Sequence, residues 1–231
     1  MAKQPLHLAI IPDGNRRWAR AHALQPWKGH EQAVENFRII IDWSRKNPHI
    51  GTLTLWCFST ENWKRDTAEV SKLMEMLEQY LRNERDALNK NRTRLVHSGR
   101  RDRIPSSLAT LLQEIMDETA AHDGFTLHLA LDYGGKDEIL RAISRFINTS
   151  KPRNLKTPEP PDLRPFLDQP NLPDLDIIVR TSGEQRTSNF FLWQSAYAEW
   201  FFLEKYFPDL SVEDLENVLK EYSERKRRFG S

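Results

Sequence analysis

The sequence predicts an α/β fold with a central, mostly parallel six-stranded sheet flanked by helices. Short, β-rich apolar segments alternate along the chain with longer amphipathic segments, which is the pattern of strand–helix repeats around a parallel sheet. The strand candidates are apolar almost without interruption, as expected for strands covered on both faces. The 231 residues can bury a core without disulfides or structural metals, and we predict one domain over residues 1–231.

Six segments have the length and composition of buried strands. They are Leu6–Ile11, Thr52–Phe58, Thr93–His97, Phe125–Leu131, Leu175–Arg180 and Trp200–Leu203. Between them the apolar residues recur at helical spacing. These helix candidates are His30–Lys46, Thr67–Asn91, Ser107–Ala121, Lys136–Ile147 and Ser211–Arg227. The proline-rich segment Lys151–Asp174 predicts a surface connection with a short helix near Leu163–Leu167.

Composition and charge narrow the range of functions. The 34 basic residues nearly cancel the 33 acidic ones, and the net charge of +1 argues against a protein that binds nucleic acid through bulk charge. The single cysteine, Cys57, excludes an internal disulfide and indicates a reducing compartment. The apolar run Leu6–Ile11 is too short for a signal peptide or a membrane span, so we expect a cytoplasmic protein.

Several sequence signatures of common enzymes are absent. The chain contains no P-loop, no dinucleotide-binding glycine pattern after its first strand, no zinc-spaced cysteine and histidine cluster and no nucleophile elbow. The Asp-Asp-x-x-Asp pattern of trans-type prenyl synthases is missing as well. Standard P-loop nucleotide hydrolysis, Rossmann-type redox chemistry and structural zinc are therefore not predicted.

Three polar, cationic segments directly follow predicted strands. They comprise residues 12–18, 58–65 and 180–189. Ligands of an open parallel sheet bind beyond the carboxyl ends of the strands, so all three segments should meet at one edge. Three arginine-bearing loops exceed what one phosphate needs, and they predict two anionic groups and hence two phosphorylated substrates. The alternative is that these residues are unrelated surface cations, or, for Ser59–Arg65, a capped helix start.

The first of these segments predicts a phosphate cradle. Gly14 allows a close backbone approach, and the backbone N–H groups of a helix start, with Arg16 and Arg17, attract phosphate. The carboxylate of Asp13 would repel that phosphate unless a hard cation such as Mg²⁺ bridges them. The alternative is a helix cap at Asp13 followed by solvated arginines, because Asp13-Gly14-Asn15 is also a common turn sequence.

Two isolated residues complete the candidate site. His30 follows Lys28 and Gly29 at a predicted helix start, from which a helix and turn could fold back to the cradle; the alternative is a structural histidine. Glu199 lies in an apolar stretch, where a carboxylate is costly unless it is paired or metal-bound. We predict it as the second magnesium partner, and an ion pair with a nearby arginine is the alternative.

Taken together, the motifs resemble those of the cis-prenyltransferases, which include the undecaprenyl and dehydrodolichyl diphosphate synthases. The resemblance rests on DGNRRWA from Asp13, FSTENWKR from Phe58, DYGG from Asp132, and RTSGEQRTSNF from Arg180 followed by LWQ and AYAE up to Glu199. It extends over nearly the whole chain, through the RRFG sequence that ends at Gly230. The order and spacing of these blocks make the resemblance specific.

The resemblance implies a Mg²⁺-dependent transferase that joins isopentenyl diphosphate head-to-tail to an allylic diphosphate such as farnesyl or geranyl diphosphate. The product is a cis polyprenyl diphosphate. The catalytic residues implied are Asp13 and Asn62, and the metal ligands are Asp13 and Glu199. The residues implied for the allylic diphosphate are Gly14, Asn15, Arg16, Arg17, Trp18 and His30. Those implied for the reacting centre are Ser59, Thr60, Glu61, Trp63 and Arg65. Those implied for isopentenyl diphosphate are Arg180, Arg186, Thr187 and Ser188.

The resemblance also implies a homodimer, an apolar product tunnel, peripheral contact with a membrane surface and a tail, Arg228–Gly230, that reaches the partner's site. Two residues depart from the family pattern. Many bacterial members have glycine at the position of Arg16 and arginine at the position of Pro26. The apolar stripe of Leu73, Met76, Leu77 and Tyr80 predicts core packing, and the resemblance places the same helix along the tunnel. Bulky Tyr80 and Cys57, where alanine is common, predict a product shorter than undecaprenyl.

Three other functions stay open from the sequence. The first is a non-catalytic subunit of a heteromeric prenyltransferase. Such subunits typically lose the Asp-Gly-Asn cradle, whereas Asp13, Arg17 and Glu199 are all present here. The second is a protein that binds anions or lipids at the same site without turnover. The third is a cis-type synthase of short or irregular prenyl diphosphates.

Overall fold

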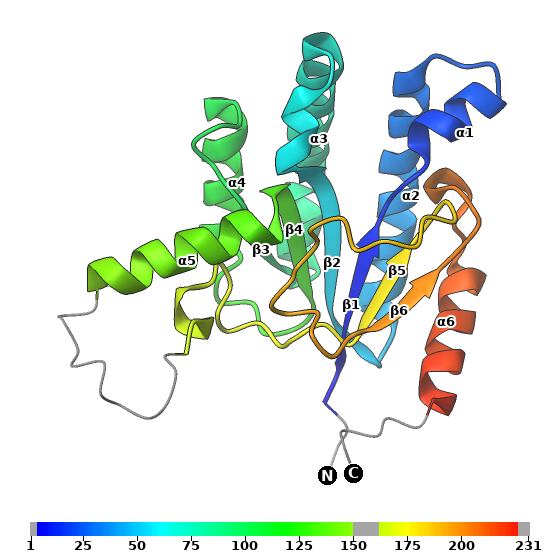
Figure 1. Cartoon of the computed structure of the whole chain (residues 1–231). Helices are drawn as coiled ribbons and strands as arrows, with labels where there is room; N and C mark the ends of the chain where they lie inside the picture. Colours follow the sequence, from blue (N-terminus) through cyan, green and yellow to red (C-terminus); the bar gives the residue numbers. More distant parts are fainter. Residues whose placement is uncertain (1–3, 150–161, 226–231) are drawn as a thin grey trace.

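A computed structural model describes residues 4–149 and 162–225. The predicted tail Arg228–Gly230 and the end of the predicted helix Ser211–Arg227 lie outside the described residues, as does the part of the proline-rich connection up to residue 161. Figure 1 shows helices arranged around one twisted sheet.

The sheet confirms the predicted class. Its six strands are all parallel, in the order β3-β4-β2-β1-β5-β6. The strands are β1 Leu6–Ile11, β2 Ile50–Ser59, β3 Arg94–Ser98, β4 Thr126–Tyr133, β5 Ile177–Arg180 and β6 Glu199–Phe202. Each contains most of a segment predicted from its apolar run, with ends that differ by at most two residues. Pairing between non-consecutive strands creates the edge where their carboxyl ends meet, and this edge holds the candidate site.

The predicted helices are present as well. The α-helices are α1 Asn15–Ala21, α2 Pro26–Lys46, α3 Thr67–Lys90, α4 Ser106–Glu118, α5 Gly135–Thr149 and α6 Val212–Glu224. Short 3₁₀ helices are η1 Thr60–Lys64, η2 Arg164–Phe166 and η3 Phe207–Asp209. Helix α2 begins four residues before the predicted His30, because Pro26 occupies a first-turn position where its missing N–H costs nothing. No helix among the described residues combines the length and apolar character needed to cross a membrane.

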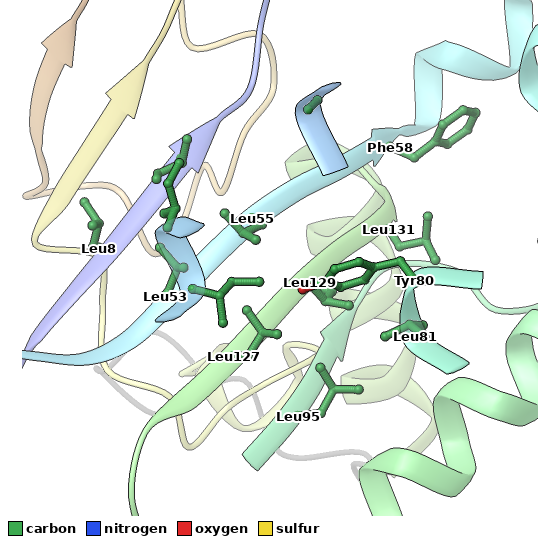
Figure 2. Packing of buried hydrophobic residues seen from close by; sticks show 14 of the residues in the cluster. Leu8, Leu53, Leu55, Phe58, Tyr80, Leu81, Leu95, Leu127, Leu129 and Leu131 are labelled. Atoms are coloured by element: carbon green, nitrogen blue, oxygen red, sulfur yellow. The ribbon is translucent and has the colours of Figure 1, made fainter. Parts of the chain in front are cut away.

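The core consists of two apolar layers, one on each face of the sheet. Alternate residues of β2 and β4 project to one side, toward Tyr80 and Leu81 of α3 (Figure 2). The layer on this face also contains apolar residues of α2, α4 and α6. The opposite face packs against Phe190 and Phe191 of the β5–β6 connection and against Tyr133. In Figure 1 this connection, drawn yellow to orange, and α5 cross in front of the sheet.

A chain of buried polar side chains crosses the strands on the face of the sheet that packs against Phe191. The Nε2 atom of His7 lies 2.6 Å from Thr54 Oγ1, which lies 2.9 Å from Nδ1 of His128. The Nε2 atom of His128 lies 2.8 Å from Ser98 Oγ. Nearby, His97 Nε2 lies 3.0 Å from the carbonyl oxygen of Leu131. Burial lowers the pKa of His7 and His97 to about 4, and it lowers the pKa of His128 well below 6.5, so all three are neutral at pH 7.

These histidines predict that the folded protein loses stability in mild acid. Below pH 6.5 the unfolded chain binds protons that the folded chain excludes until about pH 4, so the free energy of unfolding falls as the pH drops through this window. Each histidine should contribute a slope of up to about 1.4 kcal/mol per pH unit. Urea unfolding at pH 7.5, 6.0 and 5.0 measures the slope. His128→Gln should reduce it, whereas the exposed His49→Gln should leave it unchanged; equal slopes in all three proteins would contradict the assignment.

Candidate functional site

The three polar segments predicted to meet at one edge of the sheet do meet there. They surround a cavity of about 600 Å³ at the carboxyl ends of β1, β2 and β5. Nine of the predicted residues line this cavity: Asp13, Asn15, His30, Ser59, Glu61, Asn62, Arg65, Arg180 and Ser188. The mouth is therefore polar and cationic, as the sequence predicted for an anion site.

Asp13 is the centre of the mouth. Its Oδ1 accepts a hydrogen bond of 2.7 Å from the backbone N–H of Gly14, and its Oδ2 accepts one of 2.9 Å from the guanidinium of Arg180. Arg17 approaches Oδ1 at 3.4 Å. Burial acts to raise the pKa of Asp13, but the hydrogen bond and charge of Arg180, with the other donors, outweigh it and lower that pKa. Asp13 is therefore an ionised carboxylate between two arginines.

Two glycines allow the chain to form this mouth. Gly14 has φ +97°, and a Cβ there would lie 2.6 Å from Cδ1 of Tyr206, so the turn that starts α1 accepts only glycine. A Cβ on Gly29 would lie 2.0 Å from the carbonyl oxygen of Asn15. Helix α2 therefore packs closely on the first turn of α1, and this contact brings His30 to the cavity, as the sequence predicted.

Three buried polar atoms at the cavity have no hydrogen-bond partner in the described chain. They are Oδ1 of Asn15, Nε2 of His30 and Nε of Arg180. Burial, followed by the charge of Arg65, lowers the pKa of His30 to about 4, so its ring is neutral at pH 7. Because buried polar groups are nearly always paired, unpaired atoms that line a cavity point to a ligand that completes them.

The segment after β2 forms the 3₁₀ helix η1, which carries Asn62 to the cavity wall. The Oδ1 atom of Asn62 accepts a 3.0 Å hydrogen bond from the backbone N–H of Ser59, in a capping box. With its oxygen engaged by the backbone, the amide presents its NH₂ group, a donor, to a ligand. Both predictions for this segment therefore hold, because it is a capped helix start and it also lines the site.

The β5–β6 connection is held in an unusual backbone conformation. Ser182, Ser188, Asn189 and Phe191 all have positive φ values without being glycine, and such residues cluster at functional sites because they cost energy. The conformation places Ser188 Oγ 2.7 Å from Arg180, which is itself 4% exposed. Arg180 also donates to the carbonyl oxygen of Arg186. Arg180 and this loop thus place a guanidinium and a hydroxyl side by side at the position where the sequence predicts a second anion.

Asn189 is a cavity residue that the sequence analysis did not select. Its Nδ2 donates to Glu61 at 3.0 Å, and its Oδ1 accepts from the backbone N–H of Lys136 at 2.8 Å. Asn189 thereby joins η1, the start of α5 and the β5–β6 connection. The only signal in the sequence was an asparagine within a polar loop, a residue type that tolerates positive φ.

The remaining arginines surround the mouth without lining it. Arg17 donates to Ser182 Oγ at 2.6 Å and forms a 2.9 Å ion pair with Glu184, which also pairs with Arg186. Arg16 lies 3.8 Å from Glu69. Glu69 was likewise not selected from the sequence, and it lies 3.3 Å from Arg65 and 3.9 Å from His30. The side chains of Arg16, Arg17 and Arg186 are exposed, so their ion pairs are weak and a more highly charged anion can displace the carboxylates.

Four more predicted residues, besides these three arginines, Gly14 and Glu199, do not line the cavity. The indole of Trp18 donates to Asp209 at 2.7 Å and contacts the ring of His22 at a tilt, and the indole of Trp63 donates to Asp132 at 2.8 Å. Thr60 donates to Glu61 at 3.0 Å, and Thr187 is exposed on the β5–β6 connection. These side chains neighbour true cavity residues in sequence but turn away from the cavity in the fold.

Within one chain the structure does not bring Glu199, the predicted second magnesium ligand, to Asp13. Glu199 begins β6 and pairs in register with Ile177, which pairs with Leu8 of β1. Asp13 lies five residues further along, roughly 16 Å at the rise of a strand. Glu199 instead forms a 2.7 Å ion pair with Arg225. The alternative read from the sequence, a carboxylate neutralised by an arginine, is what the structure shows.

Below its polar mouth the cavity becomes apolar. Its inner wall consists of Ala33, Val34, Phe37, Trp56, Cys57, Phe58, Leu73, Met76 and Leu77. Burial raises the pKa of the Cys57 thiol to about 12, so it is a neutral, apolar group. Leu73 and Leu77 both pack against the core and line the cavity, and Met76 lines the cavity. Tyr80 is not among the lining residues and belongs to the core. The cavity is built for a molecule with an anionic head and a hydrocarbon body.

The donor set at the mouth fits a magnesium ion bound together with phosphate. Mg²⁺ in such sites takes one or two carboxylates and completes its shell with phosphate oxygens and water. Asp13 supplies one ionised carboxylate beside arginines that attract phosphate. Among residues 4–149 and 162–225 no cluster of three or more His, Cys, Asp or Glu side chains could hold a metal without such a ligand.

Comparison with known proteins agrees with this geometry. Residues 11–230 match the model of a prenyltransferase family described as "Putative undecaprenyl diphosphate synthase". The chain is 43% identical to an isoprenyl transferase of Aquifex pyrophilus, covering 99% of this chain and 96% of that protein. It is 40% identical to the isoprenyl transferase of Thermotoga maritima, covering 98% and 97%. A lavandulyl diphosphate synthase from Lavandula x intermedia, solved with dimethylallyl diphosphate, superposes with a TM-score of 0.90 at 34% identity, covering 98% of both chains.

Proposed function

Because the chain belongs to the undecaprenyl diphosphate synthase family of prenyltransferases, we propose that it condenses isopentenyl diphosphate with an allylic diphosphate such as farnesyl or geranyl diphosphate. The observation that carries the proposal is the cavity at the carboxyl edge of the sheet. Two cationic loops flank its mouth, and apolar side chains form its body. Two diphosphate heads and one growing hydrocarbon tail need this combination of surfaces.

The two loops divide the two substrates between them. The allylic diphosphate lies on the β1–α1 turn, where Asn15, Arg17 and the neutral His30 offer hydrogen bonds and charge, and its tail enters the apolar body of the cavity. Isopentenyl diphosphate lies on the β5–β6 connection, against Arg180 and Ser188, which are 2.7 Å apart. Asp13 stands between the two positions through its contact with Arg180.

The reaction forms one carbon–carbon bond and breaks one carbon–oxygen bond. The double bond of isopentenyl diphosphate attacks the allylic carbon, and diphosphate leaves with the electron pair of the broken bond. A proton is then lost from the new chain to give a cis double bond. Asn62 is a poor base, and its oxygen already accepts the Ser59 N–H. We therefore assign the proton to a diphosphate oxygen, with the amide NH₂ of Asn62 orienting that group.

Charge develops on the departing diphosphate, and the mouth stabilises it. Fixed cations aimed at developing charge in a site shielded from water give large rate effects. Arg180, held by Ser188, is such a cation, and Arg17, held by Ser182, adds positive charge at the exposed rim of the mouth. Mg²⁺, bound by Asp13 and the diphosphate, would supply further neutralisation of the leaving group.

The molecular surface supports a homodimer. Leu140 and Ile147 of α5 are 65% and 64% exposed, and Leu192 and Trp193 of the β5–β6 connection are each 36% exposed. Large exposed apolar side chains on neighbouring elements are typical of interaction surfaces. Light scattering coupled to size-exclusion chromatography would give the mass, with Leu140→Asp as the variant expected to weaken the association.

One assay tests the proposed reaction. The pure protein is incubated with labelled isopentenyl diphosphate and a panel of allylic diphosphates, with and without Mg²⁺, and product length is read by chromatography. A Mg²⁺-dependent ladder of products supports chain elongation. One short product made without further extension favours a synthase of short or irregular prenyl diphosphates, the alternative that the similarity to the lavandulyl diphosphate synthase supports. No product with any primer would favour a non-catalytic subunit or a binding protein.

We predict a product shorter than undecaprenyl, with Cys57 as one determinant. The cavity of about 600 Å³ is of the size that holds an ordinary small-molecule ligand, and Cys57 lies in its apolar wall. Cys57→Ala should lengthen the main product, because it removes a sulfur from the path of the tail, and Cys57→Leu should shorten it. A main product of undecaprenyl length in the wild-type protein, or identical ladders in all three proteins, would contradict this prediction.

A further inference from the structure

Trp63 is held behind the cavity wall by a carboxylate that the proposed reaction does not use. Its indole N–H donates to Asp132 Oδ1 at 2.8 Å, and its ring meets Phe58 edge-to-face with centroids 5.0 Å apart. Phe58 and the neighbouring Asn62 line the cavity, whereas Trp63 does not. The indole therefore anchors η1 from behind, while the residue before it faces the ligand.

Asp132 reaches this position through a bulge in the sheet. Phe58 pairs with Leu131 and Ser59 pairs with Tyr133, so Asp132 is an extra residue on β4. Its φ of +51° lies in the left-handed region. Leu131 packs in the core layer that also contacts Trp63, and Tyr133 packs in the layer on the opposite face. Bulges re-aim side chains, and this one directs a carboxylate toward η1.

The carboxylate is completely buried and fully engaged. Asp132 is 0% exposed, and its Oδ2 accepts a 2.8 Å hydrogen bond from Arg103 Nε. A second guanidinium N–H of Arg103 donates to Oδ1, and the same guanidinium lies 6.0 Å from the centroid of the Trp63 ring. The backbone N–H of Arg100 donates to the carbonyl oxygen of Asp132 at 3.1 Å. A bidentate arginine gives this carboxylate one fixed orientation.

We propose that Asp132 is a positioning residue, which holds the Trp63 indole and thereby sets the place of Asn62 beside the reacting diphosphates. The proposal rests on the proposed function. A buried ion pair at a strained residue is costly compared with apolar packing, and here its carboxylate is hydrogen-bonded to the Trp63 indole, which stands next to Asn62 in η1. Loss of Asp132 should therefore lower turnover because the indole hydrogen bond is lost. The residues proposed to bind the diphosphates, which follow β1 and end β5, should keep their positions.

Four variants separate this role from a contribution to stability. Asp132→Ala removes the hydrogen bond to the Trp63 indole and the ion pair with Arg103. It should lower kcat by about 10- to 100-fold with little change in the KM for isopentenyl diphosphate, because small misplacements of reacting groups cost this much. Trp63→Phe keeps the ring but removes the N–H, and it should lower kcat in the same way. The double variant should be no worse than Asp132→Ala alone. Asp132→Asn keeps an acceptor for the indole, so it should recover most of kcat.

Nuclear magnetic resonance of the indole N–H groups gives a readout that does not depend on activity. The resonance missing from Trp63→Phe identifies Trp63. In Asp132→Ala this resonance should shift and exchange faster with solvent, and in Asp132→Asn it should stay protected. Thr119→Val is the matched control, because it removes a buried hydrogen bond to the N–H of Leu95 at the other end of the sheet. Its melting temperature should fall without a change in kcat.

Two results would overturn the proposal. One is an unchanged kcat in Trp63→Phe; this variant also decides the matter if Asp132→Ala fails to fold. The other is an additive loss in the double variant, which would show that Asp132 acts independently of the indole. A wild-type protein without turnover would refute the proposed function instead, and the protection of the Trp63 resonance by Asp132 would still be measurable.

Discussion

Asp13→Ala should abolish nearly all turnover while the fold remains intact. Asp13 lies between Arg17 and Arg180 at the cavity mouth, and its pKa is lowered, so it is ionised at the pH of the reaction. If it holds Mg²⁺ against the leaving diphosphate, its removal should cost about 10²- to 10³-fold in kcat, the loss typical for one group that stabilises developing charge. Single-turnover kinetics with the allylic and isopentenyl diphosphates would measure this loss.

Binding distinguishes this role from a general loss of the site. Removal of one negative charge beside the diphosphates should leave their affinity without Mg²⁺ unchanged or higher, because a repulsive carboxylate has gone. Isothermal titration calorimetry with and without Mg²⁺ would measure this, with Asp13→Asn as the isosteric partner and far-ultraviolet circular dichroism as the folding control. Turnover close to wild type in either variant would refute the assignment of Asp13.

Arg180→Lys should raise the KM for isopentenyl diphosphate strongly and leave that for the allylic substrate nearly unchanged. The guanidinium of Arg180 contacts Asp13, Ser188 and the carbonyl oxygen of Arg186 at once, and its Nε remains unpaired at the cavity. Lysine keeps the charge but cannot reproduce the planar fork. We expect a loss of about 2 kcal/mol, or roughly 30-fold in KM, the lower end of the cost of altering a buried charged contact.

Arg141→Lys provides the matched control. Arg141 also donates a fork of hydrogen bonds to a buried carboxylate, that of Asp168, but it lies on α5 and does not line the cavity. It should lower the melting temperature and leave both KM values near wild type. If Arg180→Lys changes the KM for the allylic diphosphate more than that for isopentenyl diphosphate, the two substrates have been assigned to the wrong loops.

Much of the fold was predictable because buried parallel strands leave a local signal. Each strand of this sheet is a short apolar run, and each amphipathic helix repeats its apolar residues at helical spacing, so both can be read from neighbouring residues. The edge that carries the site followed from a topological rule, which places the ends of parallel strands together. For this reason Asp13, Asn62 and Arg180 could be predicted to meet across almost the whole length of the chain.

The orientation of individual side chains had no such local signal. Trp18 and Trp63 lie within motifs whose neighbours line the cavity, yet both indoles point to buried or distant carboxylates. Asn189 enters the cavity because of a positive φ, and Asp132 turns toward Trp63 because of a bulge. Positive φ values and bulges at such positions depend on how helices and strands pack together. The residue type alone does not reveal them.

By itself, the sequence determined the α/β class, the parallel sheet and the edge where the polar, cationic segments meet, because apolar periodicity and the residues after each strand carry this information. The tertiary structure alone decided which motif residues face the cavity, and it separated Glu199 from Asp13. The physical reason is strand register. Glu199 starts β6 level with Leu8, and its charge is neutralised by Arg225, which follows α6. Such a pairing arises only when the whole chain has folded.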